Sequence, residues 1–257
     1  LQQNYSSRTA LTLSRGAEER LRWTYDELQQ ERCRAAVVLQ QLGLSSGDAV
    51  LVSVQNCPHF IALFMAALQL SCCFVPLHPE VTEHLLETVL QSVRPKLVIV
   101  DAGYSLCNLQ KLHLHHCLVM ELSPDREPWL KLLPQCSRKP VYPASCQVPA
   151  LPNNEVVLQL FSSGSTGTPK VICYTRNSLN VFLHWQAQLF AAFPDLCESG
   201  TQEKVSDRIN ALPLAHFGGL SFCLQSLIAG RSLHLSVQVC ADELLLLSQR
   251  TGCQLLL

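Results

Sequence analysis

The residues best suited to chemistry lie close together in one stretch of the chain, residues 162–170. This stretch combines small hydroxyl residues and glycines with a final Pro-Lys pair: Ser162, Ser163, Gly164, Ser165, Thr166, Gly167, Thr168, Pro169 and Lys170. Glycines let the backbone turn so that successive N–H groups face one point, and hydroxyl groups add further donors. The lysine adds a full positive charge suited to a polyphosphate. The stretch is therefore a candidate cradle for an anion.

Two other interpretations of this stretch compete with the first. A loop rich in serine and glycine between Leu160 and Val171 is often only a polar turn at the protein surface. The stretch also invites comparison with the Walker loop, G-x-x-x-x-G-K-[ST]. It departs from that motif because Pro169 precedes the lysine and Val171 follows it. A P-loop nucleotide hydrolase is therefore disfavoured.

Two further groups of reactive side chains favour structural roles. His113, His115 and Cys117 would share one face of a strand, as zinc ligands do in some sites. Zinc sites more often pair their ligands through turns, however, and no second pair follows at a suitable spacing. Cys72 and Cys73 are adjacent in an apolar run and are expected to pack in the core.

The elements that must position these residues alternate between strand and helix. Parallel strands need crossover connections, which helices supply, so the alternation predicts an α/β fold with mostly parallel sheets flanked by helices. A capping box, Thr24 with Glu27, marks the start of one helix, and Gly43 marks its end. Strands are expected at 10–13, 21–23, 48–54, 73–76, 96–100, 155–161, 171–174, 208–212, 232–237 and 253–257, and helices at 25–42, 58–70, 81–93, 177–193, 219–229 and 242–249.

The alternation is interrupted once. Residues 123–154 are rich in proline, serine and charged residues, which is typical of a long loop. This predicts a first α/β region over residues 1–122 and a second over 155–257, with the phosphate loop in the second. The chain begins with Leu1 and ends in an apolar segment, so we expect it to be part of a longer protein.

The composition excludes several classes of protein. The formal net charge is −1 and no block of lysine or arginine occurs, which disfavours a nucleic-acid partner. No apolar run reaches the roughly 18–20 residues that span a bilayer. The 13 cysteines follow no repeating framework, and no secretory signal opens the chain. These features favour reduced thiols and an intracellular location, in the cytoplasm or the peroxisome.

The order of residues 162–170 resembles the phosphate loop of the adenylate-forming superfamily, [ST]-S-G-[ST]-T-G-x-P-K-G, which it matches from Ser162 to Lys170. This superfamily includes acyl- and aryl-CoA synthetases, luciferases and nonribosomal adenylation domains. Further stretches resemble the same family in the same order along the chain: WTYDEL from Trp23, LGLSSGD from Leu42, NCP from Asn56, FVPLHP from Phe74 and LPLAHFGG from Leu212. The resemblance covers essentially the whole chain and implies the incomplete N-terminal domain of that fold.

The resemblance implies an ATP-dependent ligase that uses Mg²⁺ and coenzyme A. Such an enzyme joins a small carboxylic acid to ATP, releases pyrophosphate and passes the acyl group of the adenylate to a thiol, as in fatty-acid or aromatic-acid metabolism. The implied phosphate-binding residues are Ser162, Ser163, Gly164, Ser165, Thr166, Gly167 and Lys170, with Thr166 near Mg²⁺ through the ATP phosphates. Lys170 would also hold the departing pyrophosphate. His216 matches the family histidine near the acyl pocket, although a lone histidine in an apolar run is more often a core residue.

Two positions depart from the family pattern. Val171 follows the lysine where the family usually has glycine, and Ala215 stands where an aromatic residue is usual. The family hinge and the C-terminal domain with its catalytic lysine are absent from the 257 residues. Two alternatives therefore stand beside the CoA ligase. One is a degenerate, non-catalytic relative that binds nucleotide or a protein partner, and the other is an adenylation domain that loads a carrier protein.

Overall fold

The structure is a computed structural model of the 257-residue chain. It describes residues 5–15, 18–102, 117–132, 154–162, 170–192, 207–237 and 241–253. These residues belong to two compact units. Unit 1 comprises Leu1–Glu31, Asn56–Pro58 and Asn177–Leu257, and unit 2 comprises Arg32–Gln55 and His59–Arg176. This division differs from the regions expected from the sequence, because the chain enters unit 1 three times.

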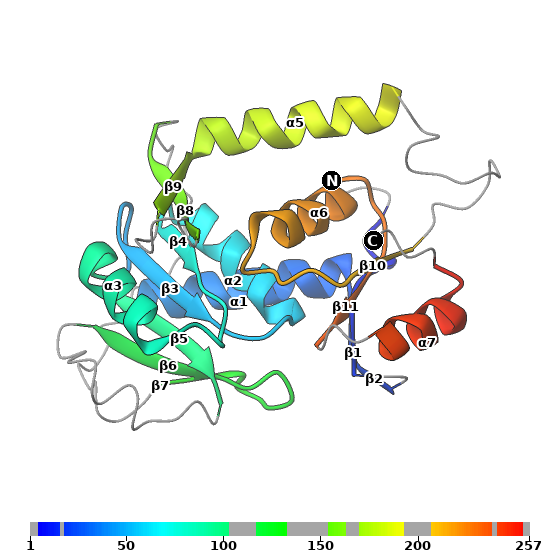
Figure 1. Ribbon diagram of the computed structural model, residues 1–257, viewed down its shortest axis with the longest axis horizontal. Coiled ribbons are helices and arrows are strands. Elements are labelled where there is room, and N and C mark those ends of the chain that lie inside the picture. The colour runs from blue at the N-terminus through cyan, green and yellow to red at the C-terminus, as the bar shows by residue number, and fades with distance from the viewer. Residues whose placement is uncertain are drawn as a thin grey trace. The chain divides into compact units, whose positions relative to one another are not determined.

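Unit 2 is built on a seven-stranded sheet with the order β7-β6-β5-β3-β4-β8-β9 (Figure 1). The five inner strands run parallel, and the two edge strands, β7 and β9, run antiparallel to their neighbours. The mostly parallel sheet predicted from the alternation is therefore confirmed. The strands are β3 (Ala49–Ser53), β4 (Cys73–Pro76), β5 (Leu97–Asp101), β6 (Leu118–Leu122), β7 (Leu130–Leu132), β8 (Val156–Ser162) and β9 (Lys170–Thr175).

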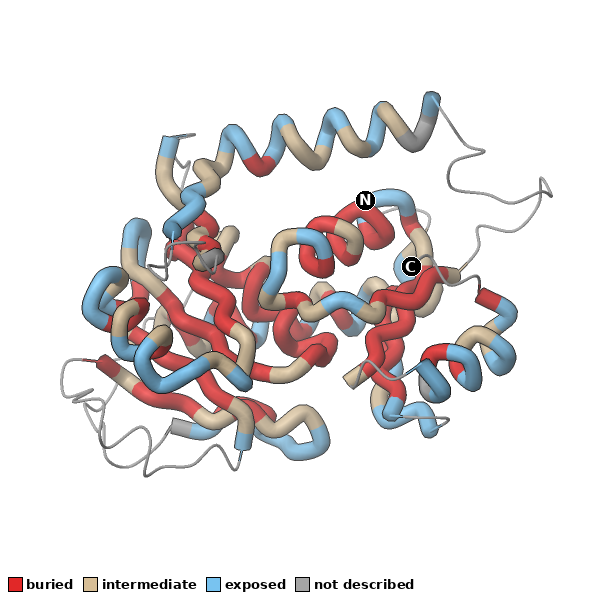
Figure 2. Tube along the Cα trace, in the orientation of Figure 1, coloured by how far each residue is buried: buried red, intermediate tan, exposed pale blue. Residues whose placement is uncertain are grey.

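Helices cover both faces of this sheet, which explains why its strands are apolar on both sides. On one face, α2 (Pro58–Gln69) places Phe60 and Phe64 edge-on against Phe74 of β4, each with ring centroids 5.3 Å apart. On the other face, α3 (Glu83–Val93) packs its buried residues against the alternate positions of β3, β4, β5 and β6. Figure 2 shows the resulting buried central strands.

Unit 1 is built on a smaller sheet with the order β10-β11-β1-β2. Its strands are β1 (Thr9–Arg15), β2 (Glu18–Thr24), β10 (Arg208–Asn210) and β11 (Leu233–Ser236). β11 pairs in parallel with both β1 and β10, and β2 pairs antiparallel with β1. Helix α7 (Ala241–Thr251) packs Leu244 and Leu247 against Ile209 on one face. Helix α6 (Phe217–Ile228) lies on the face of Arg208, whose guanidinium stacks on Phe222. A further helix, α5, spans Arg176–Ala192.

The predicted capping box is confirmed at the start of α1 (Tyr25–Gln41). The Glu27 carboxylate accepts bonds from the Thr24 backbone N–H at 2.7 Å and from its hydroxyl at 2.9 Å, and the Glu27 N–H donates to the Thr24 hydroxyl at 3.2 Å. Just after the helix, Gly43 adopts a left-handed conformation with φ of 78°, which glycine adopts without steric cost.

The structure departs from the predicted elements at a few places. β6 and β7 were not expected, and β7 lies inside the segment predicted to be a loop, where it pairs with β6. The third helix begins at Glu83 rather than Val81, because the Thr82 hydroxyl caps its first turn. Residues 111–116, with two of the histidines considered for a metal site, lie outside the described residues, as do residues 254–257. Within the part of the chain that the structure describes, no helix has the length and apolar character needed to cross a membrane.

Candidate active site

The predicted phosphate loop connects β8 to β9 at one edge of the seven-stranded sheet of unit 2. Ser162, the last residue of β8, pairs directly with Lys170, the first residue of β9. The two ends of the stretch are therefore held side by side by the sheet. Residues 163–169 lie outside the described residues, and with them Ser163, Gly164, Ser165, Thr166 and Gly167.

The topology places this stretch where parallel sheets bind ligands. β8 runs parallel to β4, so Ser162 lies at the carboxyl edge of the sheet. Open α/β sheets bind their ligands at this edge, outside the carboxyl ends of the strands. Asp101, at the carboxyl end of β5, accepts a hydrogen bond of 2.8 Å from the Gln55 N–H, and burial raises the pKa of its carboxyl group. This carboxyl edge of the sheet therefore carries the partly buried carboxyl group of Asp101 as well as the predicted phosphate loop.

Lys170 is exposed at the beginning of β9, so its ammonium group is available to an anion. The next residue, Val171, pairs with Phe161 across the hairpin and is 44% exposed. Valine in place of the glycine usual in the family is therefore accommodated as an ordinary strand residue.

The second predicted residue, His216, lies in unit 1 at the N-terminus of α6. It is the cap residue, with φ of −99° and ψ of 146°, and its side chain makes no capping bond to the helix. Its N–H donates to the Pro213 carbonyl at 3.0 Å, and its carbonyl accepts from Leu220 at 3.0 Å. The side chain is exposed rather than part of the core. His216 therefore stands where the positive end of a helix dipole favours an anion.

A buried asparagine that sequence reasoning did not assign a role holds the turn before His216. The Asn56 side chain donates to the Leu212 carbonyl at 3.1 Å and to the Ser236 carbonyl at 3.2 Å, and it accepts from the Leu214 N–H at 2.8 Å. Asn56 is only 8% exposed. One amide thus ties the turn to β11, and the sequence signal was the Asn-Cys-Pro stretch, noted only for its resemblance.

A second asparagine and a glycine hold the same turn from the helix side. The Asn210 side chain accepts from the Leu212 N–H at 3.0 Å and donates to the Gly219 carbonyl at 3.0 Å. A Cβ atom added to Gly219 would lie 2.3 Å from the Pro213 carbonyl oxygen, whereas one added to Gly218 would meet only the Leu212 side chain at 3.6 Å. Gly219 is therefore required for the close approach of α6 to the turn.

The predicted site residues fall into two groups. Ser162 and Lys170 are brought together by the β8–β9 hairpin of unit 2, and His216 lies on a rigidly held turn of unit 1. The chain matches the family model described as "AMP-binding enzyme" over residues 2–256. The chain belongs to the AMP-binding enzyme family.

Curated relatives of this AMP-binding protein include ligases and a multidomain synthetase. It is 25% identical over 194 residues to crotonobetaine/carnitine–CoA ligase from Escherichia coli, an alignment that covers 72% of this chain and 37% of the ligase. It is 30% identical over 157 residues to the hybrid PKS-NRPS synthetase xenE from Xenoacremonium sinensis, which covers 61% of this chain and 4% of the synthetase.

Solved structures share the fold of this AMP-binding protein. O-succinylbenzoate coenzyme A synthetase from Bacillus subtilis in complex with AMP has a TM-score of 0.73 at 20% identity, covering 98% of this chain and 58% of the synthetase. Apo MatB from Rhodopseudomonas palustris has a TM-score of 0.73 at 20% identity, covering 97% of this chain and 46% of MatB. The predicted fold, the N-terminal domain of adenylate-forming enzymes, is confirmed, and the chain spans about half the length of these proteins.

Proposed function

We propose that the protein activates a carboxylic acid with ATP to form an acyl-adenylate, and then transfers the acyl group to coenzyme A. The observation that carries this proposal is the β8–β9 hairpin. It holds Ser162 beside Lys170 at the carboxyl edge of a parallel sheet, and its sequence matches the phosphate loop of the family. Family membership supports the chemistry, and the curated CoA ligase supports the thiol acceptor.

The first step poses an electrostatic problem that the assigned residues address. A carboxylate oxygen attacks the α-phosphorus of ATP, the bond to the bridging oxygen breaks, and pyrophosphate leaves with the electron pair. Both reactants are anions, so positioning and charge stabilisation account for most of the catalysis. We assign Lys170 to the departing pyrophosphate, and Ser163, Ser165 and Thr166 to the β- and γ-phosphates. Magnesium, when bound with ATP near Thr166, supplies further neutralisation of the phosphate oxygens.

His216 is proposed to contact the acid substrate, as its match to the family histidine near the acyl pocket implies. Its exposure at the N-terminus of α6 leaves the ring accessible to a ligand. The hydrogen bonds of Asn56 and Asn210 fix the backbone of the turn before it, so the ring needs little rearrangement when substrates bind. Ala215, which replaces an aromatic residue, leaves more room beside His216, so we expect an acid of larger cross-section to be accepted at this point.

The proposal is tested by ATP–pyrophosphate exchange in the full-length protein that contains this chain, with a panel of aliphatic and aromatic acids. Exchange needs only the first half-reaction and does not depend on the thiol. We expect exchange that requires one class of acid and Mg²⁺. ATP binding without exchange for any acid would contradict catalysis and favour the non-catalytic relative.

The thiol acceptor is tested separately. The similarity to a hybrid PKS-NRPS synthetase supports a second candidate, an adenylation domain that loads a carrier protein. We expect the acid that supports exchange to be converted to its CoA thioester, detected by mass spectrometry. Transfer only to a phosphopantetheinylated carrier protein would assign the second candidate instead.

A further inference from the structure

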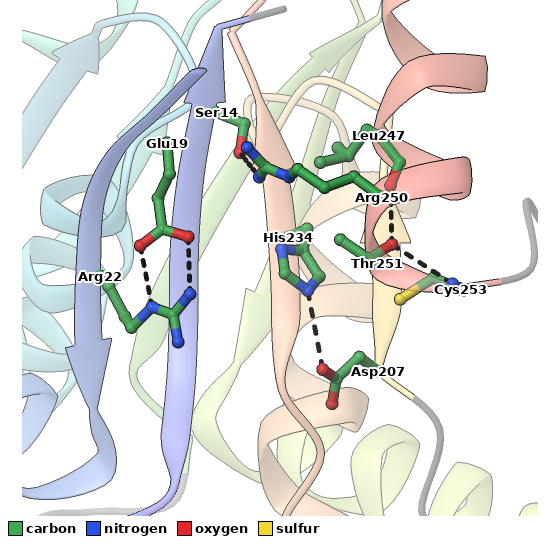
Figure 3. Close-up of polar contacts among 9 residues, drawn as sticks. All are labelled: Ser14, Glu19, Arg22, Asp207, His234, Leu247, Arg250, Thr251 and Cys253. Carbon is green, nitrogen blue, oxygen red and sulfur yellow. Dashed lines mark hydrogen bonds and ion pairs between the residues drawn. The ribbon is translucent and has the colours of Figure 1, made fainter. Parts of the chain in front are cut away.

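Three side chains able to ligate a metal ion lie together in unit 1. Asp207 precedes β10, His234 lies on β11, and Cys253 follows α7. One carboxylate oxygen, one imidazole nitrogen and the sulfur all lie within 4.8 Å of one another. Figure 3 shows the His234 ring directed toward Asp207, with the sulfur of Cys253 turned to the same space beside α7.

The fold brings these residues together from three separate segments. β10 pairs in parallel with β11, and Ile209 of β10 lies opposite His234 of β11. Asp207 directly precedes β10, two residues before Ile209. Cys253 packs with Ile209 and the buried leucines of α7 on the same face of the sheet. Its backbone is fixed by two hydrogen bonds, from its N–H to Thr251 Oγ1 at 3.2 Å and from Ser248 Oγ to its carbonyl at 2.6 Å.

The histidine in this cluster is buried, and the described residues do not supply the hydrogen bonds that a buried imidazole requires. His234 is 6% exposed, and neither ring nitrogen has a hydrogen-bond partner among the described residues. A carboxylate oxygen of Asp207 lies 3.7 Å from His234 Nε2, beyond hydrogen-bond distance. The hydroxyl of Thr12, the cross-strand neighbour of His234, is likewise buried without a partner in the same described set. Such groups cost free energy unless a ligand satisfies them.

The spacing fits a metal ion better than it fits direct hydrogen bonds. In a tetrahedral zinc site, ligand atoms about 2.0–2.3 Å from the ion lie about 3.3–3.8 Å from each other. The 3.7 Å between His234 Nε2 and Asp207 falls in this range. The other atoms, within 4.8 Å, need to move by about 1 Å to reach the same spacing. We propose that Asp207, His234 and Cys253 form a binding site for a zinc-like divalent metal ion, which goes beyond the proposed ligase function.

The donor set suits zinc in charge and in kind. Binding releases the thiol proton of Cys253 and any proton on the bound nitrogen of His234 to solvent, and no electrons are transferred. The resulting thiolate and carboxylate offset the charge of the ion. The Asp207 side chain is 42% exposed, which leaves solvent access for entry and for a water ligand. Two neighbouring arginines are already engaged, Arg22 with Glu19 and Arg250 with Ser14.

The competing interpretation is a simple ion pair. Burial lowers the pKa of His234, but Asp207 and Cys253 outweigh this effect and raise it to about 9, so without a metal the ring can carry a proton beside the carboxylate. An ion pair and a metal site predict different responses to added Co²⁺. Only the metal site produces a tetrahedral cobalt spectrum with sulfur-to-cobalt charge transfer.

The test is titration of the full chain with Co²⁺, followed by displacement with Zn²⁺, monitored by visible and near-ultraviolet absorption. The variants are Cys253→Ser, His234→Leu and Asp207→Asn. His234→Leu places an apolar side chain of similar size in a buried position, and Asp207→Asn alters a partly exposed side chain, so these two variants are expected to fold. Since the chain has 13 cysteines, Cys33→Ser, at an exposed cysteine of unit 2, is the matched control.

We expect one equivalent of Co²⁺ with a thiolate charge-transfer band. The band should be lost in Cys253→Ser and unchanged in Cys33→Ser. Zn²⁺ affinity should fall about 100-fold or more in His234→Leu and about 10-fold or more in Asp207→Asn. The proposal is overturned if the unmodified chain shows no thiolate band, if the band persists in Cys253→Ser, or if Zn²⁺ affinity is unchanged in His234→Leu and Asp207→Asn.

Discussion

Replacing glycine with alanine in the first turn of α6 should change the stability of the protein differently at two adjacent positions, Gly218 and Gly219. In Gly219→Ala the new Cβ would lie 2.3 Å from the Pro213 carbonyl oxygen and 2.9 Å from the Leu212 carbonyl oxygen. Removing this clash with the Pro213 carbonyl oxygen requires a backbone shift of about 0.7 Å, since real Cβ contacts begin near 3.0 Å. The neighbouring turn resists this shift because Asn56 and Asn210 hold it.

The cost of overpacking and the gain in helix propensity decide whether Gly219→Ala raises or lowers the free energy of unfolding. Overpacking of this kind costs about 1–3 kcal/mol, and the rigid backbone contact places Gly219→Ala at the upper end of that range. Alanine recovers at most about 0.8–1.0 kcal/mol of helix propensity. We therefore expect a net loss of about 1–2 kcal/mol for Gly219→Ala. Gly218→Ala meets only Leu212 at 3.6 Å and should be neutral or gain up to about 0.5 kcal/mol.

Equilibrium urea unfolding of both variants measures this difference, as a change in midpoint at constant slope. In the full-length protein, Gly219→Ala should also slow pyrophosphate exchange about 10–100-fold, because the turn that carries His216 is displaced. Gly218→Ala should leave exchange unchanged. Equal stability of the two alanine variants would refute the close packing of α6 against the turn.

Three further predictions concern buried groups. Asn56→Ala should destabilise the protein by about 2–4 kcal/mol in urea unfolding, because three backbone groups lose their partner. Asn56→Asp, which keeps only the acceptor, should be nearly as destabilising. An alanine variant of unchanged stability would contradict the role given to this amide. Burial lowers the pKa of His59 to about 4, so the folded state disfavours the imidazolium. The contribution of neutral His59 to the free energy of unfolding should be fully present above about pH 6.5 and should fall by at most about 3 kcal/mol toward pH 4, a loss that His59→Phe should remove. Identical pH profiles of stability for the two proteins would contradict this prediction. Burial raises the pKa of Cys72 to about 12, whereas Cys33 is exposed. Iodoacetamide followed by peptide mapping should modify Cys33 and spare Cys72 in the native protein, and equal labelling would disprove the burial of Cys72.

Local signals in the sequence predicted much of the fold. The capping box of Thr24 and Glu27 identified the start of α1, and the apolar run at 73–76 identified β4 residue for residue. These features depend on neighbours within a few positions. β7 could not be predicted in the same way, because it is a short strand in a segment rich in loop-forming residues and exists through its pairing with β6.

The residues of the candidate site also differ in whether neighbouring sequence could predict them. The hairpin that carries Lys170 follows from a contiguous motif, so its position was predictable. The role of Asn56 was not, because its partners Leu214 and Ser236 are 158 and 180 residues away in the chain. Asp207, His234 and Cys253 likewise come from three separate elements with no motif spacing. The sequence analysis weighed only His113, His115 and Cys117 as metal ligands, because their alternate spacing makes them recognisable in the sequence, and it favoured structural roles for them.

The central claim is that the β8–β9 hairpin binds the phosphates of ATP, and the most direct measurement is ATP affinity in Lys170→Ala. Lys131→Ala is the matched control, because Lys131 is also exposed on an edge strand of the same sheet. Loss of a charge-assisted bond to phosphate predicts affinity weakened about 10–100-fold in Lys170→Ala, and unchanged affinity in Lys131→Ala. Equal ATP affinity in the two variants would contradict the assignment of residues 162–170 as the phosphate loop.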